Sequence, residues 1–292
     1  MSRKAHPGDV DGWQLVQDNP TYLKCTLDHH EGLGIRWHSP GSEHSSQVFC
    51  VSTFGQLRRL PDRDNILATL FAGLPSADRT GRSWELALEY SDADLLGETG
   101  RGTPTSVDVF CRCADMAICI ESKFLVDADE GFGCCSQAKS GSCAGHHGPD
   151  SDKRTQTDAS CRLTVAEGRR DARRYWQAGR SYFRGSVFLD QDAGHDCPFR
   201  GPSFQLMRNF LFAARAAGQT GTFGVLCIVP ERKAAACRKQ VEVFRASILL
   251  PEYRSFIRLT TYDILSAALT SSNHPESRRL GRFIDERMRT LL

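Results

Sequence analysis

Two short apolar segments in the middle of the chain carry charged residues where a β-strand would bury them. Asp108 lies in the first segment, residues 107–112, Glu121 lies at the end of the second, residues 117–122, and Lys123 follows it directly. Burying a charged group alone is costly, so these residues need a structural or chemical reason. Side chains two residues apart in a strand share a face, so Glu121 and Lys123 are expected to point the same way.

The few residues between the two segments predict a β-hairpin, which would place Asp108 beside Glu121. Two close carboxylates repel each other unless a cation lies between them. Carboxylate oxygens suit Mg²⁺ or Mn²⁺, and a lysine beside the metal can orient a water or share its proton. This set of groups is typical of metal-assisted hydrolysis of a phosphodiester. The alternative is a surface hairpin with an ordinary salt bridge.

The sequence around the hairpin predicts a mixed α/β domain with additional C-terminal helices. Residues 83–90 fit either a helix or a strand. The other predicted strands are 222–229 and 256–260, and the other predicted helices are 64–73, 165–183, 203–217, 231–248, 263–269 and a C-terminal amphipathic segment. The expected order is therefore helix, strand, strand, helix, strand, with further elements on both sides.

The pattern D-x12-E-x-K resembles the PD-(D/E)XK nuclease superfamily. The resemblance implies a restriction-endonuclease-like core of helix, three strands, helix and strand, with the Asp and the E-x-K on neighbouring strands. It also implies that Asp108 and Glu121 bind the metal, helped by the backbone carbonyl of Ser122, and that Lys123 positions or activates the attacking water. Val107 stands where the superfamily name has Pro, a departure that weakens the match only slightly.

The helix predicted after the hairpin carries polar residues at positions 0, 3 and 4, which share one face: Gln205, Arg208 and Asn209. Some branches of the superfamily carry a Gln on this helix that faces the metal, so the resemblance makes Gln205 a candidate catalytic residue. For Arg208 and Asn209, a solvated helix face is an equal alternative.

Seven short segments extend the resemblance to a group of bacterial restriction-type endonucleases, over about residues 85–265. They are LEYSD, TSVDVF, IESKF, FGCCSQ, GRRDARRYW, CPFRGPSFQLMRN and RLTTYDIL. The resemblance implies a Mg²⁺-dependent DNA endonuclease in restriction or in defence against foreign DNA, and a double-strand cutter of this kind would commonly act as a homodimer. A third acidic ligand would come from Glu85, Glu89 or Glu98.

Four cysteines follow the hairpin in polar, irregular sequence: Cys135, Cys143, Cys161 and Cys197. Four such thiolates can hold one Zn²⁺ or an iron–sulfur cluster, and some nucleases of the superfamily carry a four-cysteine cluster. The spacing contains no C-x2-C pair, so free cysteines are an equal alternative. Five other cysteines lie in predicted strands or helices and are expected to be core residues: Cys111, Cys113, Cys119, Cys227 and Cys237.

Residues 153–184 hold nine Lys or Arg residues against three acidic residues, whereas the whole chain has a formal net charge of only +2. A positive patch beside a metal site would attract phosphates. The candidate nucleic-acid contacts are Arg169, Arg170, Arg173 and Arg174. The alternative is an exposed helix whose aromatic residues pack inward.

A length of 292 residues with 40% hydrophobic and 25% charged residues is typical of a globular protein. We expect a single nuclease-like domain over residues 1–292, with an irregular N-terminal extension over 1–60 and a cysteine-containing basic insertion over 134–200. No long apolar run and no secretory signal is visible, which predicts a cytoplasmic protein without a membrane partner. The alternatives are a catalytically inactive, nuclease-fold nucleic-acid-binding protein with a structural zinc or iron–sulfur site, and a redox-responsive metal–sulfur regulator.

Overall fold

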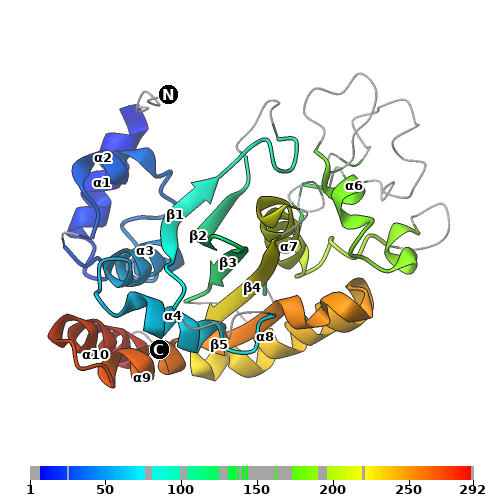
Figure 1. Ribbon diagram of the computed structural model, residues 1–292. Helices are drawn as coiled ribbons and strands as arrows, with labels where there is room; N and C mark the ends of the chain where they lie inside the picture. Colours follow the sequence, from blue (N-terminus) through cyan, green and yellow to red (C-terminus); the bar gives the residue numbers. More distant parts are fainter. Residues whose placement is uncertain are drawn as a thin grey trace.

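A five-stranded mixed β-sheet organises the chain, in the order β1-β2-β3-β4-β5 (Figure 1). Its strands are β1 Glu85–Ser91, β2 Ser106–Cys113, β3 Met116–Ser122, β4 Thr222–Val229 and β5 Ile257–Thr261. The first three strands pair antiparallel, and β3, β4 and β5 pair parallel. The computed structural model describes residues 7–24, 26–75, 81–98, 104–124, 131–135, 137, 140–141, 143, 161, 163, 173–189, 196–218 and 221–290.

The predicted hairpin is present, with Val109 paired to Ile120 and a turn between Cys113 and Met116. Every residue of β3 is buried, because this strand has a neighbour on each side and helices on both faces. Residues 83–90, whose pattern fitted either a helix or a strand, contain most of β1.

Helices cover both faces of the sheet, with α7 on one side and α3 and α4 on the other (Figure 1). The first face packs against α6 Tyr175–Gly179, α7 Phe204–Ala217 and α8 Glu231–Val243, and the second against α3 Ser46–Leu57, α4 Arg63–Phe71, α9 Tyr262–Thr270 and α10 Pro275–Thr290. Short turns complete the described elements: η2 Gly185–Phe188, η4 Phe244–Ile248 and η5 Pro251–Phe256. Helices α7 and α8 precede β4 and β5, and supply the crossovers that parallel pairing requires. The arrangement is compatible with an α/β nuclease-like fold.

The prediction of an irregular segment over residues 1–60 is wrong. This part of the chain forms α1 Pro7–Asp18, α2 His29–Gly34 and α3, which lie together near β1 (blue in Figure 1). Helix α3 is buried on nearly every side, so its sequence lacks the one-sided apolar pattern that marks a surface helix. Helix α2 has only six residues and includes two glycines, which weaken the helical signal further.

Strand β1 changes the face to which its side chains point at Glu89. Leu88 packs into the core on the α3 side, whereas Tyr90 packs into the core on the α7 side. Residues two apart in a regular strand share a face, so the alternation is broken between them. Glu89 lies at this break and has a φ of 47°, in the left-handed region, and the paired strand β2 changes faces at the same level, between Val107 and Val109. The pairing of its neighbours places Glu89 across from Asp108.

A buried carboxylate joins two parts of the chain that are about 70 residues apart. Glu98 accepts hydrogen bonds from the Thr105 backbone N–H at 2.5 Å and from the Tyr175 hydroxyl at 2.7 Å. Arg173 Nη1 lies 2.8 Å from Glu98 Oε1 and balances its charge. This group, which we call the Glu98 clamp, fixes the chain just before β2 to the start of α6.

Among the described residues, no helix combines the length and the apolar character needed to cross a membrane.

Candidate active site

The residues singled out by the sequence meet at one end of β3. Asp108, Lys123 and Gln205 line a cavity of about 680 Å³, together with Glu89 and Arg208. They come from β2, from the residue after β3, from α7 and from β1. The hairpin and α7 therefore bring the predicted catalytic residues to one place.

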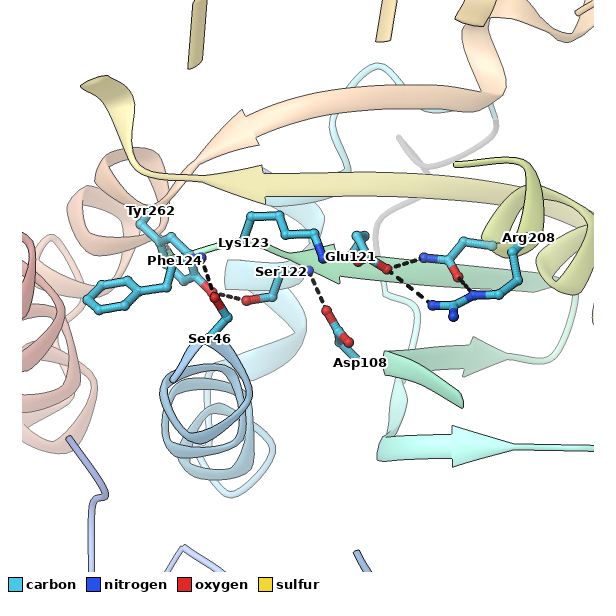
Figure 2. Close-up of polar contacts among 9 residues, drawn as sticks. Ser46, Asp108, Glu121, Ser122, Lys123, Phe124, Arg208 and Tyr262 are labelled. Carbon is cyan, nitrogen blue, oxygen red and sulfur yellow. Dashed lines mark hydrogen bonds and ion pairs between the residues drawn. The ribbon is translucent and has the colours of Figure 1, made fainter. Parts of the chain in front are cut away.

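Glu121 is fully buried and lies on the α7 side of β3 (Figure 2). Lys123 Nζ is 2.7 Å from Glu121 Oε1, Asn209 Nδ2 donates to Oε2 at 2.5 Å, and Arg208 Nη2 is 3.8 Å from Oε2. Burial alone would raise the pKa of Glu121, but the charges of Lys123 and Arg208 outweigh it and hold the pKa below its usual range. Glu121 is therefore the carboxylate that stays ionised.

Asp108 has the opposite tendency, although it lies on the neighbouring strand. Burial raises the pKa of Asp108 well above its usual range, and the charge of Glu121 raises it further. Its Oδ2 accepts a hydrogen bond from the Ser122 backbone N–H at 2.7 Å, which holds the carboxyl against the end of β3 (Figure 2). The two carboxyls are thus close enough to repel, as the hairpin pairing predicts.

Glu89 is the third acidic residue of the site. Among the three candidates from the sequence, it alone lines the cavity, and its charge raises the pKa of Asp108. Its own pKa is raised, first by burial, while hydrogen bonds from Gln47 and from Ser106 act in the opposite direction. The third acid therefore comes from strand β1, and its left-handed backbone conformation is the feature that sequence patterns do not reveal.

Lys123 is protonated in this arrangement. Burial would lower its pKa, but the charges of Glu121 and Asp108 outweigh that effect and raise it above the usual range. A lysine with a raised pKa donates hydrogen bonds and does not accept a proton. It can therefore orient a water or an oxyanion by donating hydrogen bonds.

Helix α7 contributes more than the single predicted residue. Gln205 lines the cavity, as the resemblance implied, and Arg208 and Asn209 hold Glu121. For these two residues a solvated helix face was an equal alternative, and the contacts with Glu121 now exclude it. Asn209 is fully buried against Glu121, so the helical spacing of these three residues was the available signal.

On the face covered by α3 and α9, the end of β3 is held by three hydroxyl groups. Ser122 Oγ and the Tyr262 hydroxyl are 2.5 Å apart, and Ser46 Oγ at the start of α3 accepts from the Phe124 backbone N–H at 3.1 Å (Figure 2). These bonds fix the backbone on both sides of Lys123. Precise placement of the lysine therefore depends on helices of the second face.

The donor set suits a hard divalent cation. Glu121 Oε1 is buried and, despite the ion pair with Lys123, accepts no well-directed hydrogen bond. Within the described ranges no group of three or more His, Cys, Asp or Glu converges closely enough to hold a metal ion. Mg²⁺ does not need such a cage, because it typically uses one or two carboxylates and completes its shell with waters and phosphate oxygens. Glu89, Asp108 and Glu121 meet that lower requirement.

The four predicted thiolate ligands lie near one another. Cys135, Cys161 and Cys197 are buried in the same core cluster, and charges on Cys135 and Cys143 would raise the pKa of both Cys161 and Cys197. Burial raises the pKa of Cys161 to about 11 and that of Cys197 to about 12. Backbone N–H groups two residues downstream, at Leu163 and Phe199, donate to these two sulfurs, and Trp176 Nε1 donates to Cys161 Sγ at 3.2 Å.

Sulfurs that accept N–H donors resemble thiolates in metal sites, but the thiols among the described residues do not reach ligand spacing. The four-cysteine site therefore stays a prediction. The five cysteines expected in the core behave as predicted, since Cys111, Cys119, Cys227 and Cys237 are buried and Cys113 is half-buried.

The predicted arginine patch falls partly outside the described residues, which do not include Arg169 and Arg170. Arg173 belongs to the Glu98 clamp, and Arg174 donates its backbone N–H to Leu96. The aromatic residues Tyr175 and Trp176 are buried, so the described part of this segment matches the alternative of inward-packing aromatics.

Comparison with known proteins gives one match. The model of a protein family described as restriction endonuclease associating with ARP matches residues 16–285, a range that includes the site and all five strands. No curated protein matches the chain significantly, and no solved structure does.

Proposed function

The chain belongs to the family of restriction endonucleases associating with ARP, and we propose that it is a metal-dependent nuclease that hydrolyses DNA phosphodiester bonds. One observation supports the chemistry above all others: Glu89, Asp108 and Lys123 line one cavity, and the buried Glu121 lies directly behind it in contact with Lys123. We further propose that this site is of the PD-(D/E)XK type. The family description supports a role in restriction and an association with ARP.

In this proposal Glu89, Asp108 and Glu121 hold Mg²⁺ or Mn²⁺, helped by the backbone carbonyl of Ser122. The bound cation would polarise the phosphodiester and lower the pKa of the attacking water. Asp108 must be ionised to act as a ligand, and its raised pKa means that burial opposes this ionised form until a cation is bound.

The remaining residues of the site orient the reacting groups and hold Glu121 in place. Lys123 and Gln205 position the water or the developing oxyanion, because both line the cavity and both can donate a hydrogen bond. Asn209 and Arg208 keep Glu121 in place from α7. Because Glu121 is fully buried and held by these contacts, its position is fixed before the substrate arrives.

Plasmid DNA incubated with the purified protein and Mg²⁺ or Mn²⁺ tests the proposal. We expect cutting by the wild type and a rate at least about 100-fold lower for Asp108→Asn and Glu121→Gln, because each removes a metal-binding carboxylate. Glu242→Gln, on the exposed face of α8, is the matched control and should cut at the wild-type rate.

Equal cutting by the wild type and by Asp108→Asn would reject the assignment of this site. Salt-sensitive DNA binding by a wild type that does not cut under either metal would instead support the nuclease-fold binding protein.

A further inference from the structure

The cavity that contains the carboxylates has a second wall, built from the N-terminal part of the chain. Residues 36–47, between α2 and the first turn of α3, supply it, and we call this segment the N-terminal wall. Its lining side chains include Arg36, His38 and His44, and the rest are small or polar: Ser39, Ser42, Ser45, Ser46 and Gln47. Arg36, His38 and His44 are exposed to solvent.

The sheet side of the cavity offers little attraction to a phosphate backbone. It is lined by two carboxylates, Glu89 and Asp108, and by two cations, Lys123 and Arg208, with the carboxylate of Glu121 buried behind them. Both cations lie next to Glu121, at 2.7 and 3.8 Å, so their charge is largely compensated. The N-terminal wall supplies the complementary groups, since imidazole, guanidinium and hydroxyl groups all donate hydrogen bonds to phosphate oxygens.

The N-terminal wall is held in a defined position. Asn19 Nδ2 donates to the carbonyls of Pro40 and Ser42, at 2.7 and 2.8 Å. Gln47 Oε1 accepts from the His38 backbone N–H at 2.7 Å, and Gln47 Nε2 donates to the Arg36 carbonyl at 3.0 Å. These bonds use backbone groups of the wall, so its histidine side chains are presented on a fixed support.

The same wall is connected to the carboxylates across the cavity. The Gln47 side chain also hydrogen-bonds Glu89, and Ser46 accepts from the backbone N–H of Phe124, the residue after Lys123. The two walls are therefore held at a set separation by hydrogen bonds from α3. A nucleic-acid strand that lies between the two walls would contact the carboxylates on one side and the histidines on the other.

We propose that the N-terminal wall binds backbone phosphates of the nucleic-acid strand that is cut, through His38, His44 and Arg36. The inference rests on the proposed function and deepens it, because it assigns substrate binding to a segment outside the hairpin and α7. It also gives the half of the cavity remote from the carboxylates a role in affinity.

Binding without cutting tests this inference. The anisotropy of a fluorescein-labelled DNA oligonucleotide is measured in EDTA between about 50 and 200 mM salt, and plasmid cutting with Mg²⁺ is measured in parallel. For Arg36→Ala we expect the slope of log K against log salt to fall in magnitude by about one, the effect of one lost phosphate contact. For the double variant His38→Ala/His44→Ala we expect Kd to rise by about fivefold or more.

Two controls remove similar groups that do not line the cavity: His30→Ala on α2 and Arg282→Ala on α10, both exposed. They should bind within about twofold of the wild type, a difference too small to represent a lost phosphate contact. If the wild type binds and cuts while both wall variants keep its slope and its Kd, the inference is overturned and the proposed function stands. If the wild type neither binds nor cuts DNA, the proposed function fails and the inference fails with it.

Discussion

The pKa values of Asp108 and Glu121, two carboxyls on neighbouring strands, are shifted in opposite directions. Burial raises the pKa of Asp108, and Glu121 raises it further, whereas Lys123 and Arg208 keep the pKa of Glu121 low. The difference arises because the cations lie against only one of the two carboxyls. The ionised form of Glu121 is favoured before a cation binds, whereas ionising Asp108 costs free energy because it is buried beside Glu121. A divalent cation offsets that cost because it neutralises both carboxylates.

The opposite shifts predict opposite stability changes. A raised folded pKa means that ionising Asp108 destabilises the fold, and this cost develops as pH rises from about 4 through the folded pKa. Asp108→Asn, which keeps the acceptor for Ser122, should therefore raise the melting temperature at neutral pH by roughly 2–4 °C, measured in EDTA, with little change near pH 4.

Glu121→Gln should change the melting temperature in the opposite direction. The lowered pKa of Glu121 means that its ionised form stabilises the fold above about pH 4, and that this stability is lost as pH falls through the folded pKa. The variant should therefore melt below the wild type at neutral pH, by a margin that shrinks in acid. Melting differences that keep one size and one sign across the pH range would contradict both assignments.

At this scale the sequence predicted Asp108, Glu121, Lys123 and Gln205 as members of one site. Strand and helix periodicities place residue types on known faces, and the resemblance supplied the role of Gln205. The role of Asn209 was open, since spacing shows that residues share a helix face but does not show what that face contacts. The choice of Glu89 depended on a backbone angle, and no local pattern predicts a left-handed residue inside a strand.

At the scale of elements, the break in β1 makes a prediction about backbone strain. A left-handed conformation costs a residue with a Cβ roughly 1–2 kcal/mol, whereas glycine adopts it freely. Glu89→Gly should therefore be more stable than Glu89→Ala by about 1 kcal/mol in chemical denaturation. Both variants lose the carboxylate, so the comparison isolates the backbone contribution.

Ala87→Gly in the same strand is the control, because Gly in a regular strand is expected to be less stable than Ala by about 0.5–1 kcal/mol. If Glu89→Gly proved less stable than Glu89→Ala, as at an ordinary strand position, the left-handed conformation of Glu89 would be in error.

Strands β2 to β5, α7 and the last two helices could be predicted because their apolar patterns are regular and their ends are marked, whereas the broken alternation of β1 left it open. The N-terminal helices could not, because α3 is apolar on nearly all sides and α2 is a six-residue helix with two glycines. The same limitation hid the N-terminal wall, whose neighbourhood depends on contacts between residues far apart in the sequence.

At the scale of the whole molecule, the four cysteines carry a prediction of a second metal site. We expect protein purified anaerobically to contain about one zinc ion or one iron–sulfur cluster per chain, because the sulfurs of Cys161 and Cys197 already accept backbone N–H donors. Elemental analysis with a visible absorption spectrum distinguishes the two. Cys197→Ser should lose the metal, whereas Cys237→Ser on α8 should keep it. If metal-free protein melts at the same temperature as the protein as purified, free cysteines are favoured.

The Glu98 clamp has a consequence for how this protein can vary. Because the buried Glu98 ties Thr105, just before β2, to Tyr175, the hairpin and the start of α6 keep their positions relative to each other whatever the length of the chain between Phe124 and Arg173. The entropic cost of closing a longer loop rises only slowly with its length. Segments inserted into this part of the chain, away from its buried residues Phe132, Cys135 and Cys161, should therefore leave the catalytic framework intact, which makes it the natural place for new specificities to be acquired.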